Sequence, residues 1–184
     1  NRNPKLKNKP LVVGENIVTT ASYEARKYGI HSAMKVSDAK LLCPKLIVIP
    51  VDKTEYIRIS NEIHNLIFKI TNKVEFIATD EGYIDLTDVI NPENKKSFAI
   101  KFKQRIKELT NLTCSVGISF NKLSAKIASD INKPFGFFIF ENEKEFIKYI
   151  SDKKIRIIPG VGKKFFEILK HDKIFYVKDV FKYS

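Results

Sequence analysis

Two short apolar segments, residues 74–78 and 83–87, have the branched and aromatic side chains of β-strands and are separated by only a few residues. Such a pair is expected to fold as a hairpin. Apolar residues recur at helical spacing before it, from 56 to 70, and after it, from 97 to 109. A strand-like run at 113–119 and a helix at 123–131, rich in small residues, follow. Helices placed between strands in this way indicate an α+β fold with a ferredoxin-like sheet.

Further elements are expected on either side of this region. Strand-like runs at 11–14, 17–20 and 46–50, with helical pieces between 23 and 42, predict a small α+β unit. From Glu141, a Lys-rich helical stretch leads to a glycine hairpin and another helix, with no closing element, so this last region is expected to be truncated. The predicted regions are 1–52, 53–135 and 136–184.

The balance of charge favours nucleic acid as a partner. The chain has 33 Lys and Arg against 21 Asp and Glu, a formal charge of +12, which attracts a polyanion. Biased codon usage is the alternative explanation for many lysines. Two cysteines are too few for a disulfide framework or a Cys-based zinc site, so we expect a reducing, cytoplasmic environment. The apolar runs are far shorter than the roughly 20 residues that span a bilayer, so no membrane segment is expected.

Asp80 and Glu81 lie between the two strand-like runs of the hairpin and are followed by Gly82. Adjacent residues of a regular strand point to opposite faces, so both carboxylates can serve one site only if the backbone turns there. Gly82 is expected to make that turn. Mg²⁺ is commonly held by one or two carboxylates together with substrate phosphates. The alternative, which is the commoner one for an isolated pair, is a solvated acidic turn.

A second candidate site begins where a helix follows the strand at 17–20. Thr20, Tyr23 and Arg26 are three residues apart, and with the N–H groups of a helix N-terminus they predict a phosphate cradle. A hydroxyl cap followed by a surface arginine is the alternative. A third candidate is Lys126, on the helix at 123–131, where a lysine would offset the charge of a triphosphate. A solvated lysine is the alternative there.

A fourth candidate is the tight hairpin Gly160-Val161-Gly162-Lys163 at the start of a helix. Two glycines let a phosphate approach the backbone closely, and the helix N-terminus donates N–H groups to it. This pattern is typical of helix-hairpin-helix modules, which hold a DNA backbone without reading bases. A purely structural glycine turn is the alternative. The nucleotide-binding P-loop spacing is absent.

In their order along the chain, these four segments resemble the DinB branch of the Y-family DNA polymerases. Residues 18–30 (VTTASYEARKYGI) resemble the fingers motif, and residues 79–85 (TDEGYID) resemble the palm motif Ser-x-Asp-Glu-Ala-Tyr-x-Asp, with Thr and Gly as departures. The resemblance implies that Thr20, Tyr23 and Arg26 hold the triphosphate of the incoming nucleotide. It also implies that Asp80 and Glu81 are catalytic and bind Mg²⁺.

The resemblance extends to residues 115–134, which match the palm segment whose lysine, here Lys126, meets the triphosphate, and to 159–163, which match the DNA-gripping hairpin of the thumb. It implies fingers at 1–52, palm at 53–135 and the start of a helical thumb at 136–184. The implied activity is template-directed DNA synthesis of the lesion-bypass type. The implied partners are primer-template DNA, dNTP and, for the full-length protein, a sliding clamp.

One family motif has no match in this sequence. The Asp-x-Asp-x-Phe-Phe-like strand, which supplies a further metal-binding aspartate and the aromatic steric gate, is expected before residue 1, and a little-finger domain is expected after the thumb. The chain alone is therefore expected to be a poor catalyst. Two other functions remain open: a non-catalytic DNA-binding module that uses the hairpin and the basic surface, and a nucleotide cyclase with metal-binding carboxylates on a similar sheet.

Overall fold

The computed structural model describes residues 3–183 and divides the chain into two compact units, Asn1–Asn61 and Glu62–Ser184. Both units combine helices with small sheets, which confirms the α+β class. The expected division into three regions stays a prediction. None of the helices in residues 3–183 is long and apolar enough to cross a membrane.

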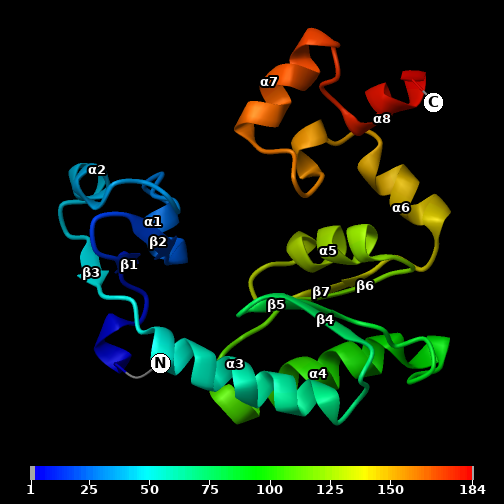
Figure 1. Cartoon of the computed structure of the whole chain (residues 1–184), viewed down its shortest axis with the longest axis horizontal. Coiled ribbons are helices and arrows are strands. Elements are labelled where there is room, and N and C mark those ends of the chain that lie inside the picture. Colours follow the sequence, from blue (N-terminus) through cyan, green and yellow to red (C-terminus); the bar gives the residue numbers. More distant parts are fainter. Residues whose placement is uncertain (1–2, 184) are drawn as a thin grey trace. The chain divides into compact units, whose positions relative to one another are not determined.

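The first unit is built on a three-stranded sheet in the order β2-β1-β3 (Figure 1). The central strand β1 (Leu11–Gly14) is antiparallel to β2 (Val18–Ala21) and parallel to β3 (Ile47–Ile49). Gly14 ends β1 with a φ of +151°, and a Cβ atom there would lie 2.1 Å from the Ile17 carbonyl oxygen. Only glycine therefore fits this turn.

Three short helical segments complete this unit: η1 (Pro4–Leu6), α1 (Tyr23–Arg26) and α2 (Val36–Leu42). Gly29, with a φ of +81°, lies between α1 and α2 and separates the two helical pieces as the sequence predicts. One core joins the sheet to both α-helices. Its buried residues are Val12, Val18, Ala21, Ala25, Ile30, Val36, Ala39, Cys43 and Leu46.

The long helix α3 (Lys53–Phe68) begins in the first unit and ends in the second. In the second unit, β4 (Val74–Ala78) and β5 (Glu81–Ile84) form the expected antiparallel hairpin. The segment η2 (Pro92–Asn94) and helix α4 (Lys95–Thr110) follow. Strand β6 (Val116–Ile118) pairs in parallel with β7 (Phe137–Ile139), and α5 (Lys122–Ile131) crosses over between them. In the described residues, the two strand pairs are separate ladders, β4-β5 and β6-β7.

The rest of the second unit is helical: α6 (Glu143–Ile150), η3 (Ile155–Ile157), α7 (Lys163–His171), α8 (Val177–Val180) and η4 (Phe181–Tyr183). Its core is continuous with α5, because Ile127 and Ala128 belong to the same buried cluster as residues of the later helices. Phe140 is almost fully buried at the centre, with ring centroids 5.2 Å from Phe146 and 5.3 Å from Tyr149. The helix α5 is therefore anchored by the helices that follow it in the sequence.

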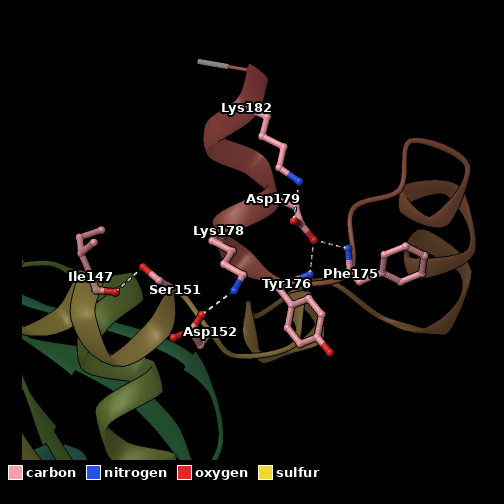
Figure 2. A network of polar contacts seen from close by, with 8 residues as sticks. All are labelled: Ile147, Ser151, Asp152, Phe175, Tyr176, Lys178, Asp179 and Lys182. Carbon is pink, nitrogen blue, oxygen red and sulfur yellow. Dashed lines mark hydrogen bonds and ion pairs between the residues drawn. The ribbon is translucent and has the colours of Figure 1, made fainter.

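Asp179 organises the end of the described chain (Figure 2). Its carboxylate accepts hydrogen bonds from the backbone N–H groups of Tyr176 (2.9 Å) and Phe175 (3.0 Å), and Lys182 Nζ lies 3.0 Å away. The backbone bond from Tyr176, then Lys182, then the bond from Phe175 lower the pKa of Asp179 to about 2. Beside it, Lys178 pairs with Asp152 at 2.8 Å, which connects α8 to the segment after α6.

Candidate active site and DNA-binding hairpin

The hairpin β4-β5 places the two acidic residues differently from the sequence-based expectation. The turn consists of Thr79 and Asp80, and Glu81 is already the first residue of β5, opposite Ala78. The expectation that Gly82 makes the turn is therefore wrong. Gly82 lies within β5 opposite Phe76, where a Cβ atom would be 3.0 Å from the Glu75 carbonyl oxygen and 3.0 Å from Phe76 Cδ1. Because Gly82 has no side chain, β5 can pack closely against Glu75 and Phe76 of β4.

One face of the hairpin meets α5. Glu75 lies opposite Tyr83, and Glu81, two residues before Tyr83, shares the same face. The Lys126 Nζ atom is 2.7 Å from Glu81 Oε1. Lys122, one turn earlier on α5, forms an ion pair with Glu75 and lies 5.8 Å from the centre of the Tyr83 ring. Two ion pairs thus connect one helix to one strand pair.

The other face of the hairpin carries Phe76, which packs on the end of α3. The His64 and Phe76 rings are stacked with centroids 3.6 Å apart, and Phe68 meets Phe76 edge-on at 5.7 Å. The hairpin therefore has an apolar, aromatic side and a charged side. The acidic residue Glu81 is on the charged side.

The surroundings of the two acidic residues differ. Asp80 is exposed at the turn and makes no hydrogen bond or ion pair within residues 3–183. Glu81 is half-buried and paired with Lys126, whose side chain is 22% exposed. Burial acts to lower the pKa of Lys126, but the hydrogen bond from its ammonium to Glu81, with the charges of Asp130, Glu81 and Tyr83, outweighs burial and raises this pKa. Lys126 is thus held in its charged form beside Glu81.

Close packing fixes the helix that carries Lys126. Asn121 caps α5, because its Oδ1 accepts a hydrogen bond from the Ser124 N–H at 2.9 Å. Gly117 of β6 lies directly under the helix: a Cβ atom there would be 2.0 Å from the Ala125 carbonyl oxygen and 2.4 Å from the Ser129 nitrogen. The strand and helix therefore approach each other as closely as backbone atoms allow.

The fingers candidates lie in the first unit. Thr20 is an exposed residue of β2, and Tyr23 and Arg26 are the first and last residues of the single-turn helix α1. Arg26 Nε donates to the Ala21 carbonyl oxygen at 3.0 Å, and its guanidinium carbon is 5.6 Å from the Tyr23 ring centre. The hydrogen bond therefore holds the Arg26 guanidinium beside the Tyr23 ring.

The backbone of α1 contributes less to a phosphate cradle than the sequence suggested. The hydroxyl of Ser22 caps the helix by accepting a hydrogen bond from the Ala25 N–H at 3.1 Å, and the same hydroxyl donates to the Lys9 carbonyl oxygen. The cap thus occupies the Ala25 N–H, and the segment adds side-chain donors: the exposed Thr20 hydroxyl, the Tyr23 hydroxyl and the outer nitrogens of Arg26.

Magnesium fits the carboxylate donors at the turn of the β4-β5 hairpin. Residues 3–183 contain no group of three or more His, Cys, Asp and Glu side chains that could hold a metal. Asp80 and Glu81 supply two carboxylates at adjacent positions. Carboxylate oxygens are hard ligands, and Mg²⁺ is usually bound by one or two of them, with phosphates and water completing its shell.

The hairpin at 160–163 leads into the N-terminus of α7. Gly160 has a φ of +92°, and Val161 is buried in the core, so its side chain anchors the turn. The N–H groups of Val161 and Gly162 donate to the carbonyl oxygens of Ile158 (3.0 Å) and Gly160 (2.9 Å), so the donors offered to a ligand are those of the first turn of α7. Gly162 caps α7 without a side-chain hydrogen bond. Neither glycine would bring a Cβ atom within 4 Å of another atom. Gly162, with a φ of −77°, therefore has no intramolecular reason to be glycine.

Comparison with protein families identifies residues 1–130 as matching the impB/mucB/samB family. This chain belongs to that family. It is 93% identical to DNA polymerase IV of Fusobacterium nucleatum subsp. nucleatum over 183 residues, covering 100% of this chain and 52% of that protein. It is 38% identical to DNA polymerase IV of Staphylococcus aureus (strain bovine RF122 / ET3-1) over 188 residues, covering 98% of this chain and 56% of that protein.

Solved structures of Y-family DNA polymerases also match this chain. An insertion ternary complex of Dbh DNA polymerase matches with a TM-score of 0.89 and 36% identity, covering 98% of this chain and 55% of that one. DinB from Sulfolobus solfataricus matches with a TM-score of 0.88 and 36% identity over the same shares. The resemblance to the DinB branch of the Y-family is confirmed. The chain spans about half the length of the relatives that it matches.

Proposed function

We propose that this chain is the fingers, palm and first thumb segment of a template-directed DNA polymerase of the lesion-bypass type. Two proteins named DNA polymerase IV, which match 100% and 98% of this chain, support this function. The observation that carries it is the contact between Glu81 and Lys126, at 2.7 Å. This contact joins the acidic pair of one motif to the lysine of another, on elements far apart in the sequence.

In this function, Asp80 and Glu81 hold Mg²⁺ at the turn of the hairpin. Two bound Mg²⁺ ions would supply Lewis-acid stabilisation to the attacking 3′-hydroxyl oxygen and the departing pyrophosphate. The chain's own contribution is to bind and orient the nucleotide. Thr20 and Tyr23 donate hydroxyl hydrogen bonds to the triphosphate, while Arg26 and Lys126 neutralise its charge.

The hairpin at Gly160, Val161, Gly162 and Lys163 grips the DNA backbone. The first-turn N–H groups of α7 lack a side-chain cap, and both glycines leave open space above the backbone. A phosphate can therefore approach the helix N-terminus, where the dipole is favourable. Lys163 adds a positive charge at the first position of α7. Such contacts position the duplex without reading its sequence.

Three further predictions accompany this proposal. The Asp-x-Asp-x-Phe-Phe-like motif of the family has no counterpart among the 184 residues, so the chain by itself is expected to extend primers poorly. The other two predictions concern the full-length protein: that it lies in the cytoplasm and that it binds a sliding clamp.

Primer extension tests the function, in a full-length protein carrying this chain. Asp80→Asn and Glu81→Gln are each expected to slow extension by about 100-fold or more, the size typical of removing one preorganised electrostatic group. Duplex binding is expected to change little, because the proposed grip on the DNA backbone is made by the hairpin at 160–163 and not by these carboxylates. Extension by either variant at a near wild-type rate would refute the assigned roles. Steeply salt-dependent duplex binding without any template-dependent synthesis would instead favour the DNA-binding module.

A further inference from the structure

Lys122 and Lys126 are one helical turn apart on α5, and both contact the charged face of the β4-β5 hairpin. Their environments differ. The Lys122 side chain is 60% exposed and its partner Glu75 is 50% exposed, whereas the Lys126 side chain is 22% exposed and Glu81 is 39% exposed. Solvent therefore screens the outer pair more than the inner one.

The ammonium of Lys126 lies at Glu81, the residue that binds a cation in the proposed function. A divalent cation bound by Glu81 would stand within a few ångströms of this ammonium, and like charges at such a distance repel strongly in a partly buried site. The helix α5 cannot withdraw, because Gly117 and Ala125 are in backbone contact. The charge can move only by rotation of the flexible lysine side chain.

We infer that Lys126 is an exchangeable counter-ion of Glu81, an inference that rests on the proposed function. In the ligand-free protein its ammonium neutralises the Glu81 carboxylate. When a divalent cation arrives together with a nucleoside triphosphate, the ammonium moves from the carboxylate to the phosphates. A cation that arrives without nucleotide brings no phosphate to which the ammonium could move. Such a cation must therefore compete with the ammonium for the Glu81 carboxylate. Lys126 therefore makes the site selective for a nucleotide-bound cation over a bare one.

Removal of the ammonium is then expected to change two affinities in opposite directions. Lys126→Met should bind bare Mn²⁺ about tenfold more tightly, because an opposite charge near a carboxylate is commonly worth one pKa unit or more. The same variant should bind a deoxynucleoside triphosphate more weakly at saturating Mn²⁺. Linkage requires that the nucleotide then also raises Mn²⁺ affinity less than in the wild type.

Mn²⁺ binding to the full-length protein carrying this chain is measured from the loss of the free-ion signal in electron paramagnetic resonance. Nucleotide binding is measured by calorimetry. Lys122→Met is the matched control, since it removes the same charge from the same helix but leaves Lys126 on Glu81. If Lys126→Met does not fold, as judged by circular dichroism, Lys126→Gln replaces it.

Mn²⁺ affinity that rises in Lys126→Met no more than in Lys122→Met would overturn the inference, because the effect would then be one of net charge. Asp80→Ala separates this failure from failure of the proposed function. If Asp80→Ala abolishes Mn²⁺ binding while the two lysine variants behave alike, only the counter-ion exchange is wrong. If Asp80→Ala binds Mn²⁺ as tightly as the wild type, the proposed metal site itself fails.

Discussion

The buried ammonium of Lys103 donates a hydrogen bond to the backbone carbonyl oxygen of Phe135 and lies 4.3 Å from the centre of the Phe135 ring. Lys103 is on α4, and Phe135, with a φ of 61°, lies between α5 and β7. A second ring, Phe137, is 5.6 Å from the same ammonium. The lysine thus holds the connection that returns the chain from α5 to β7.

Replacing this lysine tests its structural role. Lys103→Met keeps much of the side-chain volume but removes the charged hydrogen bond and the attraction to the two rings. We expect a loss of about 1–3 kcal/mol in the free energy of unfolding, the range for a hydrogen bond from a charged group. Urea unfolding of the full-length protein measures it. Lys101→Met, an exposed position on the same helix, is the control, and an equal effect of both substitutions would contradict the assignment.

Two glycine substitutions separate packing from DNA contact. Gly117→Ala places a methyl group against the backbone of α5 and should destabilise the fold by about 1–3 kcal/mol or more. Gly162→Ala meets no atom of the chain and should cost about 1 kcal/mol or less, mainly by weakening the helix cap. Its duplex affinity should nevertheless fall, because the methyl group obstructs a phosphate. Fluorescence anisotropy with labelled duplex checks this, and unchanged affinity of Gly162→Ala would argue against a backbone grip there.

The carboxylate of Asp179 should make stability depend on pH in the acid range. Its folded pKa, about 2, is below the roughly 3.9 of an unfolded chain. The stabilisation is therefore present above about pH 4 and is lost as the pH falls through about 2. Asp179→Asn should lower the melting temperature at pH 7, and the difference from the wild type should shrink toward pH 2. Thermal melts monitored by circular dichroism measure both.

Asp152→Asn is the control for that series, since it breaks the exposed pair with Lys178 in the same network. An exposed ion pair contributes little, so this variant should melt close to the wild type at pH 7. A difference between Asp179→Asn and wild type that stays constant down to pH 2 would show that the charge of Asp179 is not what stabilises the C-terminal segment.

Most helices and strands are predicted correctly because the periodicity of their apolar residues lies within each segment. The helix expected at 97–109 is α4, and the helix expected at 123–131 is α5. Strand β7 was not predicted, because Phe137–Ile139 is three residues long and is defined by its pairing with β6. The short helical segments α8 and η4, which follow α7, were not predicted either. Strand β7 depends on its pairing with β6, and α8 depends on contacts with the segment after α6, such as the hydrogen bond from the Lys178 N–H to the Ser151 carbonyl oxygen at 2.9 Å.

For the candidate site too, local motifs predict which residues take part but not which side chains are in contact. The motifs pointed to Glu81 and Lys126, but nothing in either segment showed that their side chains meet. No motif indicates Glu75, although its partner Lys122 is four residues before Lys126 and therefore lies on the same helical face. A glycine after an acidic pair suggests a turn, whereas Gly82 allows close packing across the two strands of the hairpin.

In the proposed function, Asp80 and Glu81 hold the cation of an incoming nucleotide. The decisive experiment titrates Mg²⁺·dNTP onto the complex of the full-length protein with a dideoxy-terminated primer-template, for the wild type and for Asp80→Ala. Asp80→Ala is expected to lower nucleotide affinity by about tenfold or more, as expected when a paired charge is lost, with unchanged affinity for the DNA. Equal nucleotide affinity in both proteins would contradict this role of Asp80.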